Sequence, residues 1–144
     1  MLKRFFSSDD INRDFGLLVL RVVVALSVMA FHGWGKLSGG VESWERIGGS
    51  MGNLGITWIP VFWGFMAAFA EAICSLLVIV GVLFRPATLL LAFTMFVAVM
   101  SHLSRPPDAP GAGWSAASHA LELSAVFLGL FFTGPGKYSL MPRR

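Results

Sequence analysis

Long apolar runs alternate with short polar stretches along the whole chain. Four of these runs hold roughly 18 to 26 residues, and about 20 helical residues cross the hydrocarbon core of a bilayer. None of the four shows the charged outer face that a helix of a soluble bundle needs. We therefore predict an all-α integral membrane four-helix bundle. It forms one domain over residues 1–144, with spans at about residues 16–37, 58–83, 86–103 and 115–133.

The connections between the runs predict how the helices are joined. Only Phe84 and Arg85 separate the second run from the third, so these two form a tight antiparallel hairpin with Pro86 at the first helical position. Between the first and second runs, glycines flank residues 41–47, whose pattern predicts a short helix lying on the membrane interface. Prolines and glycines in residues 104–114 predict an irregular loop.

Composition agrees with this class of protein. The chain is 56% hydrophobic and 13% charged, with a mean hydropathy of +0.72. Basic residues before the first run resemble the start of a signal peptide, but that run is long and contains Arg21, so we expect it to remain as a span. The single cysteine, Cys74, excludes a paired-thiol mechanism within one chain.

The positions of the basic residues predict the orientation. Positive residues are retained on the cytoplasmic side, and four spans put both termini on one side. Seven basic residues fall on the terminal side and two, Arg46 and Arg105, on the other; the seven are Lys3, Arg4, Arg13, Arg85, Lys137, Arg143 and Arg144. We expect both termini in the cytoplasm. The net charge of +3 then reflects topology and gives no reason to expect nucleic acid binding.

All five tryptophans fall near the opposite, outer face in this orientation: Trp34, Trp44, Trp58, Trp63 and Trp114. Tryptophans at this depth form either an aromatic belt at the lipid headgroups or a platform on which a ligand ring stacks. The sequence leaves both roles open, and the same residues can serve both.

Ionisable residues inside the spans are the candidates for function, because each costs roughly 2.5–3.5 kcal/mol to insert at the membrane centre. At 3.6 residues per turn, Arg21, His32 and Lys36 share one face of the first span. Glu71 lies near the middle of the second span, so we predict an ion pair between Arg21 and Glu71. Such a pair either fixes helix register or relays charge, and the sequence does not decide between them.

The third and fourth spans add polar residues at the outer end. His102 ends the third span, and His119 and Glu122 lie three residues apart on one face of the fourth. We predict that these side chains converge in one outward-opening pocket with Glu71 at its floor: His32, Lys36, His102, His119 and Glu122. The alternatives are a Lys36 that reaches the headgroups, and histidines that lie in interfacial water without a ligand role.

Several short motifs lie at the ends of the predicted spans: HGWGKL at residues 32–37, Glu71 followed by GVLFRPA at 81–87, His102, and GPGKYSL at 134–140. In this order they resemble the DoxX family of small bacterial four-helix membrane proteins, over about residues 17–140. The terminal motif of that family ends in Asp, where this chain has Met141.

This resemblance implies a redox-associated protein of the bacterial inner membrane. DoxX-like proteins are linked to the quinone-reducing part of thiosulfate oxidation and to membrane assemblies that handle thiol and oxidative stress. We therefore expect a quinone or similar lipophilic ligand, with Glu71 and Glu122 as the catalytic proton carriers. Because the chain shows no electron-carrying centre of its own, a protein partner is expected to supply electrons. The five residues expected to bind the ligand are Arg21, His32, Lys36, His102 and His119.

Two other classes of function remain open. The first is binding or transport of a metal ion or small ligand through His32, His102 and His119, with bis-histidine haem ligation as a variant. The second is a scaffold or assembly factor, in which small residues on the helices permit contact with a partner or a second copy of the chain.

Overall fold

Four helical stretches dominate the computed structural model, which describes residues 10–141. Each is long and apolar enough to cross a membrane: Arg13–Ser38, Pro60–Val80, Phe84–Leu103 and Gly113–Thr133. The described residues form helices and no strand. The predicted all-α bundle with four spans is confirmed, with boundaries that shift by a few residues. Lys3, Arg4, Arg143 and Arg144, which entered the orientation prediction, lie outside the described residues.

A π-helical segment interrupts each of the first two spans. The first span consists of α2 (Arg13–Val28), η1 (Met29–Gly33) and α3 (Trp34–Ser38). The second consists of α5 (Pro60–Phe69), η3 (Ala70–Cys74) and α6 (Ser75–Val80). A π turn adds a residue to the helix and so rotates everything beyond it by about 100°. The two π segments pack against each other where the spans cross.

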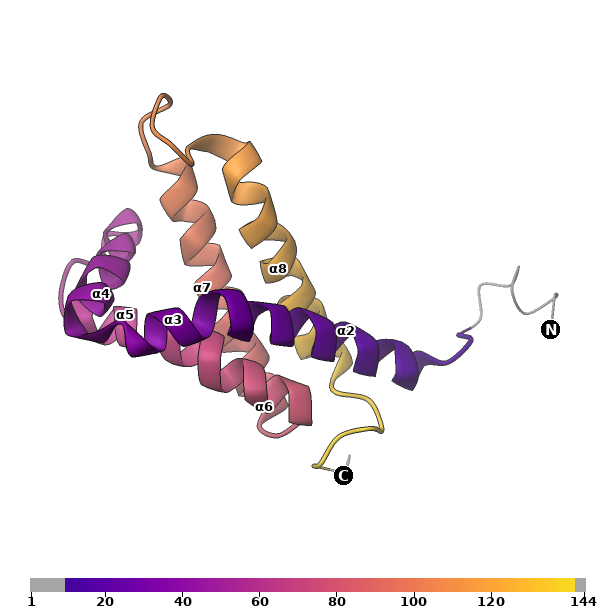
Figure 1. Ribbon diagram of the computed structural model, residues 1–144. Helices are drawn as coiled ribbons and strands as arrows, with labels where there is room; N and C mark the ends of the chain where they lie inside the picture. Colours follow the sequence, from indigo (N-terminus) through magenta and orange to yellow (C-terminus); the bar gives the residue numbers. More distant parts are fainter. Residues whose placement is uncertain (1–9, 142–144) are drawn as a thin grey trace.

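The third and fourth spans, α7 (Phe84–Leu103) and α8 (Gly113–Thr133), form an antiparallel hairpin that packs along its length. The first span crosses this hairpin obliquely instead of running beside it (Figure 1). The second span links the two halves, because α6 packs on α2 while η3 and α6 both contact α7. The core between them combines small and large apolar side chains, including Ala25, Val78, Leu91 and Phe127.

The predicted short helix between the first two spans is α4 (Gly40–Gly48), and a 3-10 turn, η2 (Gly49–Leu54), follows it. The helix packs closely against α5. A Cβ atom added at Gly64 would overlap the carbonyl oxygen of Trp44, and one at Gly48 would overlap that of Pro60. These two glycines therefore allow the backbones of α4 and α5 to touch.

The hairpin between α6 and α7 is as tight as predicted. Gly81 and Leu83 adopt left-handed backbone angles, with φ of 76° and 45°, and α7 begins directly afterwards at Phe84. Pro86 is therefore the third residue of the helix and not the first. It still falls in the first turn, where backbone N–H groups have no partner within the helix, so proline removes no hydrogen bond there.

The C-terminal residues close one end of the bundle. The buried guanidinium of Arg21 donates hydrogen bonds to the carbonyl oxygens of Pro135, at 2.7 Å, and of Tyr138. The backbone N–H of Lys137 donates to Oδ1 of Asp14 at 3.0 Å. The start of the first span and the segment after the fourth thus meet at the same end, as an even number of spans requires.

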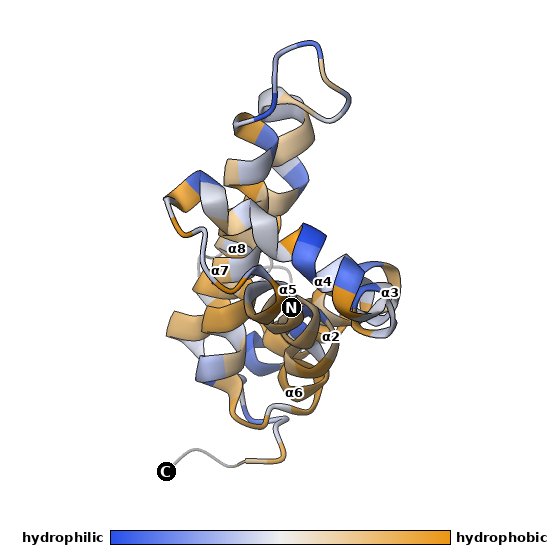
Figure 2. Ribbon diagram, turned by 90° about the vertical axis from the view of Figure 1, so that its left-hand side faces the viewer, coloured by the Kyte–Doolittle hydropathy of each residue, from blue (hydrophilic) through white to orange (hydrophobic). Residues whose placement is uncertain are grey.

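The surface of the spans is apolar, which fits contact with lipid. Figure 2 shows hydrophobic colours along α2 and α6 and hydrophilic residues at the loop joining α7 and α8. Exposed large apolar side chains occur on all four spans: Phe15, Val19, Val23, Leu26, Phe31, Phe62, Leu76, Leu89, Phe93, Phe96, Leu121, Leu128 and Phe132. Trp34, Trp58 and Trp114 are also largely exposed, which is compatible with the aromatic belt.

The contact between α4 and α5 predicts the effect of a single added methyl group. Gly64→Ala should destabilise the protein by about 1–3 kcal/mol, because the Cβ would meet the rigid backbone of Trp44. The midpoint of unfolding in mixed micelles measures this loss. Gly129→Ala is the matched control, since its Cβ meets nothing within 4 Å and alanine favours a helix. Equal stability of the two variants would contradict the close contact.

Candidate functional site

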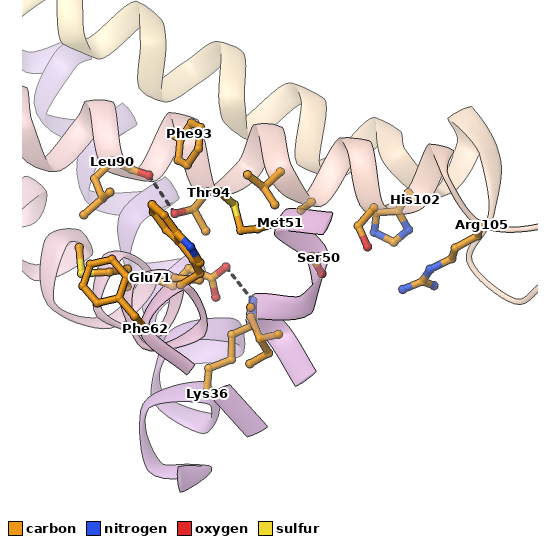
Figure 3. A pocket seen from close by; sticks show the side chains of 18 residues that line it. Lys36, Ser50, Met51, Phe62, Glu71, Leu90, Phe93, Thr94, His102 and Arg105 are labelled. Carbon is orange, nitrogen blue, oxygen red and sulfur yellow. Dashed lines mark hydrogen bonds and ion pairs between the residues drawn. The ribbon is translucent and has the colours of Figure 1, made fainter. Parts of the chain in front are cut away.

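A cavity of about 390 Å³ lies between the α3–η2 region, the second span and α7. Most of its wall is apolar: Ile47, Met51, Phe62, Trp63, Met66, Ala67, Leu90, Phe93, Val97 and Ala98. Among its polar lining residues, Lys36 lies beside Glu71, and His102 lies beside Arg105 away from that pair (Figure 3). Ser50, Thr94 and Ser101 also line the cavity. A volume of this size lies in the range of small-molecule sites, and apolar walls with a few fixed polar groups are typical of them.

The strongest electrostatic feature of the cavity is an ion pair. Nζ of Lys36 lies 2.7 Å from Oε1 of Glu71, and the two side chains are 33% and 3% exposed (Figure 3). The second carboxylate oxygen, Oε2, is buried and has no hydrogen-bond partner among the described residues. A buried polar atom without a partner costs roughly 1–3 kcal/mol or more. Glu71 therefore retains an unused acceptor at the cavity wall.

The crossing of the π segments places this pair. Gly33, in η1, lies against the backbone of η3, and a Cβ on it would overlap the carbonyl group of Glu71. Lys36 follows Gly33 by three residues, so it lies about one turn further along the same helix and reaches over Glu71. Nε1 of Trp44 donates to the carbonyl oxygen of Lys36 at 2.9 Å and ties α4 to the same place. Glycine at position 33 is thus the condition for the ion pair.

The other polar group of the cavity is held by the loop after α7. Nδ1 of His102 lies 2.7 Å from the carbonyl oxygen of Gly111. A carbonyl only accepts, so Nδ1 carries a proton, and in that tautomer Nε2 is an acceptor. Nη1 of Arg105 donates to the carbonyl oxygen of Pro110 at 3.0 Å. These contacts orient both side chains at the rim, although Arg105 itself is exposed.

The predicted single pocket is divided in the structure. Lys36, Glu71 and His102 line the cavity, but His32, His119 and Glu122 do not. Those three residues are exposed, and the rings of His32 and His119 lie near each other, tilted by 42°, with centroids 6.1 Å apart. Within residues 10–141, no group of three or more His, Cys, Asp or Glu side chains is placed to hold a metal ion.

The predicted ion pair between Arg21 and Glu71 is wrong. Arg21 donates to the carbonyl oxygens of the C-terminal segment, and Glu71 pairs with Lys36 instead. The pair was predicted from depth in the membrane. The uniform 3.6 residues per turn that placed Arg21 and Lys36 on one face fails as well, because η1 lies between them and rotates the outer part of the span. Arg21 and Lys36 consequently face different neighbours, and Arg21 does not line the cavity.

Several cavity residues were not predicted as site residues. Met51 lies in η2 and is buried over the cavity, which depends on the chain folding back after α4. Trp63 was placed at the outer face, where a lipid belt and a ligand platform were both left open. It lines the wall, and its Nε1 donates to the carbonyl oxygen of Trp58 at 3.1 Å. Tryptophan and methionine are common in both cores and binding sites, so their presence alone was no signal.

One protein family matches the chain. The DoxX profile aligns with residues 16–103, which is more than half of the 144 residues. The chain belongs to the DoxX family. The matched region contains Lys36, Glu71 and His102, and it ends before the C-terminal segment that Arg21 holds. No curated protein and no solved structure is similar enough to the chain to be reported as a match.

The cavity gives this DoxX protein a limited set of chemical abilities. Its apolar wall can hold a lipophilic molecule that enters from the bilayer. Glu71 can accept a hydrogen bond, and a carboxylate in a dry site is a suitable proton acceptor. Lys36 has three N–H donors, one of which is used on Glu71. The cavity can therefore bind a lipophilic molecule and exchange a proton with it at Glu71.

The Lys36–Glu71 pair predicts a non-additive double-mutant cycle. Lys36→Met should destabilise the protein by about 1–3 kcal/mol, less than for a fully buried pair because Lys36 is 33% exposed. Adding Glu71→Gln to Lys36→Met should restore part of the loss, since it removes the unpaired buried charge. The free energy of unfolding in mixed micelles is measured for the original protein, both single variants and the double variant. A double variant whose loss equals the sum of the two single losses would contradict the pairing.

Arg21 predicts a different phenotype, confined to the end of the chain. Arg21→Met removes the donors that hold Pro135 and Tyr138, and hydrogen bonds from a charged group are worth about 1.5–3 kcal/mol each. Tryptic cleavage after Lys137 should therefore become at least about ten-fold faster. Arg85→Met, at an exposed position, is the control. An unchanged cleavage rate would show that Arg21 does not hold the segment.

Proposed function

We propose that this DoxX protein is a redox-associated membrane subunit that binds a quinone or similar lipophilic redox molecule in the cavity beside Glu71. The observation that supports it is a buried carboxylate with an unused oxygen at the wall of an otherwise largely apolar chamber. The DoxX membership supports a membrane protein, and the redox role comes from the family resemblance.

The cavity fits the physical demands of such a ligand. A quinone has a flat ring with polar oxygens at opposite edges and an apolar tail. The aromatic side chains of Phe62, Trp63 and Phe93 offer surfaces for the ring. Phe62 and Phe93 are also exposed, which is compatible with a chamber that adjoins the bilayer and that the ligand enters from there.

Each polar residue has a role in this proposal. Glu71 accepts a proton from the ligand or returns one, and Lys36 stabilises its charged form. His102 presents Nε2 as an acceptor, so it can accept a hydrogen bond from a hydroxyl group at the far end of the ligand in its reduced form. The bound molecule supplies the electron chemistry, and a protein partner would deliver or remove the electrons. Glu122, His32 and His119 lie outside this cavity and have no part in the proposed chemistry.

The setting of this subunit is part of the same proposal. We place it in a bacterial inner membrane, with both termini in the cytoplasm and the cavity in the outer half. The meeting of Asp14 with Lys137 supports a common side for both ends of the chain. A partner protein or a second copy would contact the apolar faces that do not meet lipid.

The other classes of function have weaker support. A metal role would have to rest on fewer than three clustered side chains, such as His32 with His119, because residues 10–141 form no larger ligand group. A haem role would need a cavity beside these rings, and neither ring lines the cavity at Glu71. A scaffold role gives no reason for a buried carboxylate with an unused oxygen.

Filling the cavity tests the proposal directly. Ala67→Phe places a ring in the chamber, so binding of a short-chain benzoquinone to the purified protein in nanodiscs should weaken at least about ten-fold. Quenching of tryptophan fluorescence reports binding, because Trp63 is in the wall. Ala125→Phe, at an exposed position of α8, should leave the affinity unchanged. Equal affinity of the two variants, or no binding to the original protein, would reject the proposal.

A further inference from the structure

The unused oxygen of Glu71 restricts which ligands the cavity can accept. Oε1 is taken by Lys36, whereas Oε2 is buried without a partner among residues 10–141. An ionised carboxylate has only acceptors, so Oε2 can be satisfied by a donor and by nothing else. The side chain of Glu71 is 3% exposed, which leaves bulk water little access to it.

The neighbouring protein groups do not supply this donor. Thr94 is a cavity residue with a hydroxyl group, but its Oγ1 donates to the carbonyl oxygen of Leu90 at 2.9 Å. Lys36 makes its described contact with Oε1. Because no described residue donates to Oε2, a molecule in the cavity can take that place.

The two oxidation states of a quinone differ in their ability to donate a hydrogen bond. The oxidised form has carbonyl oxygens, which accept and do not donate. The reduced form has phenolic hydroxyl groups, each of which donates one hydrogen bond and accepts others. Placed against Glu71, a carbonyl would leave Oε2 unsatisfied and its own lone pairs near a negative charge. A hydroxyl would satisfy Oε2 and could accept from a remaining N–H of Lys36.

We propose that the ligand seated against Glu71 donates a phenolic O–H to its carboxylate, so the cavity binds the hydroquinone form of its ligand more tightly than the quinone form. This inference rests on the proposed function and names the form of the ligand that the site prefers. Glu71 is then a specificity-determining residue as well as a proton acceptor. A ten-fold preference for the reduced form raises the two-electron midpoint potential of the bound couple by about 30 mV.

A pair of matched probes tests the donor without any redox chemistry. 4-Decylphenol and its methyl ether share a skeleton, but only the phenol has an O–H donor. An equal mixture of the two is offered to the full-length protein in nanodiscs, and native mass spectrometry reads the ratio of the two adducts. We expect the phenol to be favoured by about ten-fold, the size of one charge-assisted hydrogen bond in a dry site. This comparison needs no substitution, so it does not depend on a variant that folds.

Two variants assign the preference to Glu71. Glu71→Gln replaces the carboxylate with a group that both donates and accepts, so the ratio should fall several-fold toward that of the empty nanodisc. Glu45→Gln, an exposed position on α4, should keep the original ratio. A short-chain quinone and its hydroquinone, compared under anaerobic conditions, should show the same order as the phenol and the ether.

The outcomes separate this inference from the proposed function. If both probes and the quinone bind, but the ether or the quinone binds as tightly as the hydroxyl form, the donor inference is wrong and the cavity remains a ligand site. If the ratio is unchanged by Glu71→Gln, the preference arises elsewhere and the inference is also wrong. If none of the compounds binds, the proposed function fails, and this inference fails with it.

Discussion

A carboxylate buried within a membrane-spanning helix must have a positive partner, and the site of this protein depends on how that requirement is met. Glu71 lies in the second span, whereas Lys36 comes from the outer end of the first. They meet because the two spans cross at their π segments, with Gly33 against the backbone of η3. π segments often occur at functional sites, since they turn side chains away from the regular helical pattern. Here they turn one cation toward one anion.

The cavity follows from the same crossing. Because the first two spans lie obliquely across the α7–α8 hairpin, they leave room beside η3 that helical packing does not fill (Figure 1). α4 and η2 fold back over that space, and Met51 contributes to its wall. The glycine contacts between α4 and α5 hold this cover in place. The connection between the first two spans is therefore a structural part of the site.

The spans could be predicted from the sequence, because about 20 apolar residues in a row have one stable solution in a bilayer. The short helix at α4 and the tight turn before α7 were also predictable from glycine and chain length. The pairing of charged side chains inside the bundle could not be predicted in the same way. Lys36 and Glu71 were both identified as candidates, but their depth in the membrane assigned Glu71 to Arg21. The extra residue of η1 has no clear mark in the sequence, so the rotation that it causes was invisible there. His32 and His119 illustrate the same limit, since similar depth did not bring them to the cavity.

A buried polar atom without a partner is not by itself a binding site, and three side chains of this protein show the difference. Nε of Arg21 and Oγ of Ser75 are buried and unpaired in the described part of the chain, as is Oε2 of Glu71. Arg21 has two other nitrogens bonded to backbone carbonyls, and it lines no part of the cavity, so its task is to close the end of the bundle. Ser75 is neutral, and a buried hydroxyl without a partner costs less free energy than a buried charge without one. Only the Glu71 atom combines a full charge on its group with a place at the wall of a chamber large enough for a ligand. The free energy lost by leaving that oxygen unpaired becomes available to a ligand that satisfies it, and this is why the chemistry of the bound molecule can be inferred from one oxygen atom.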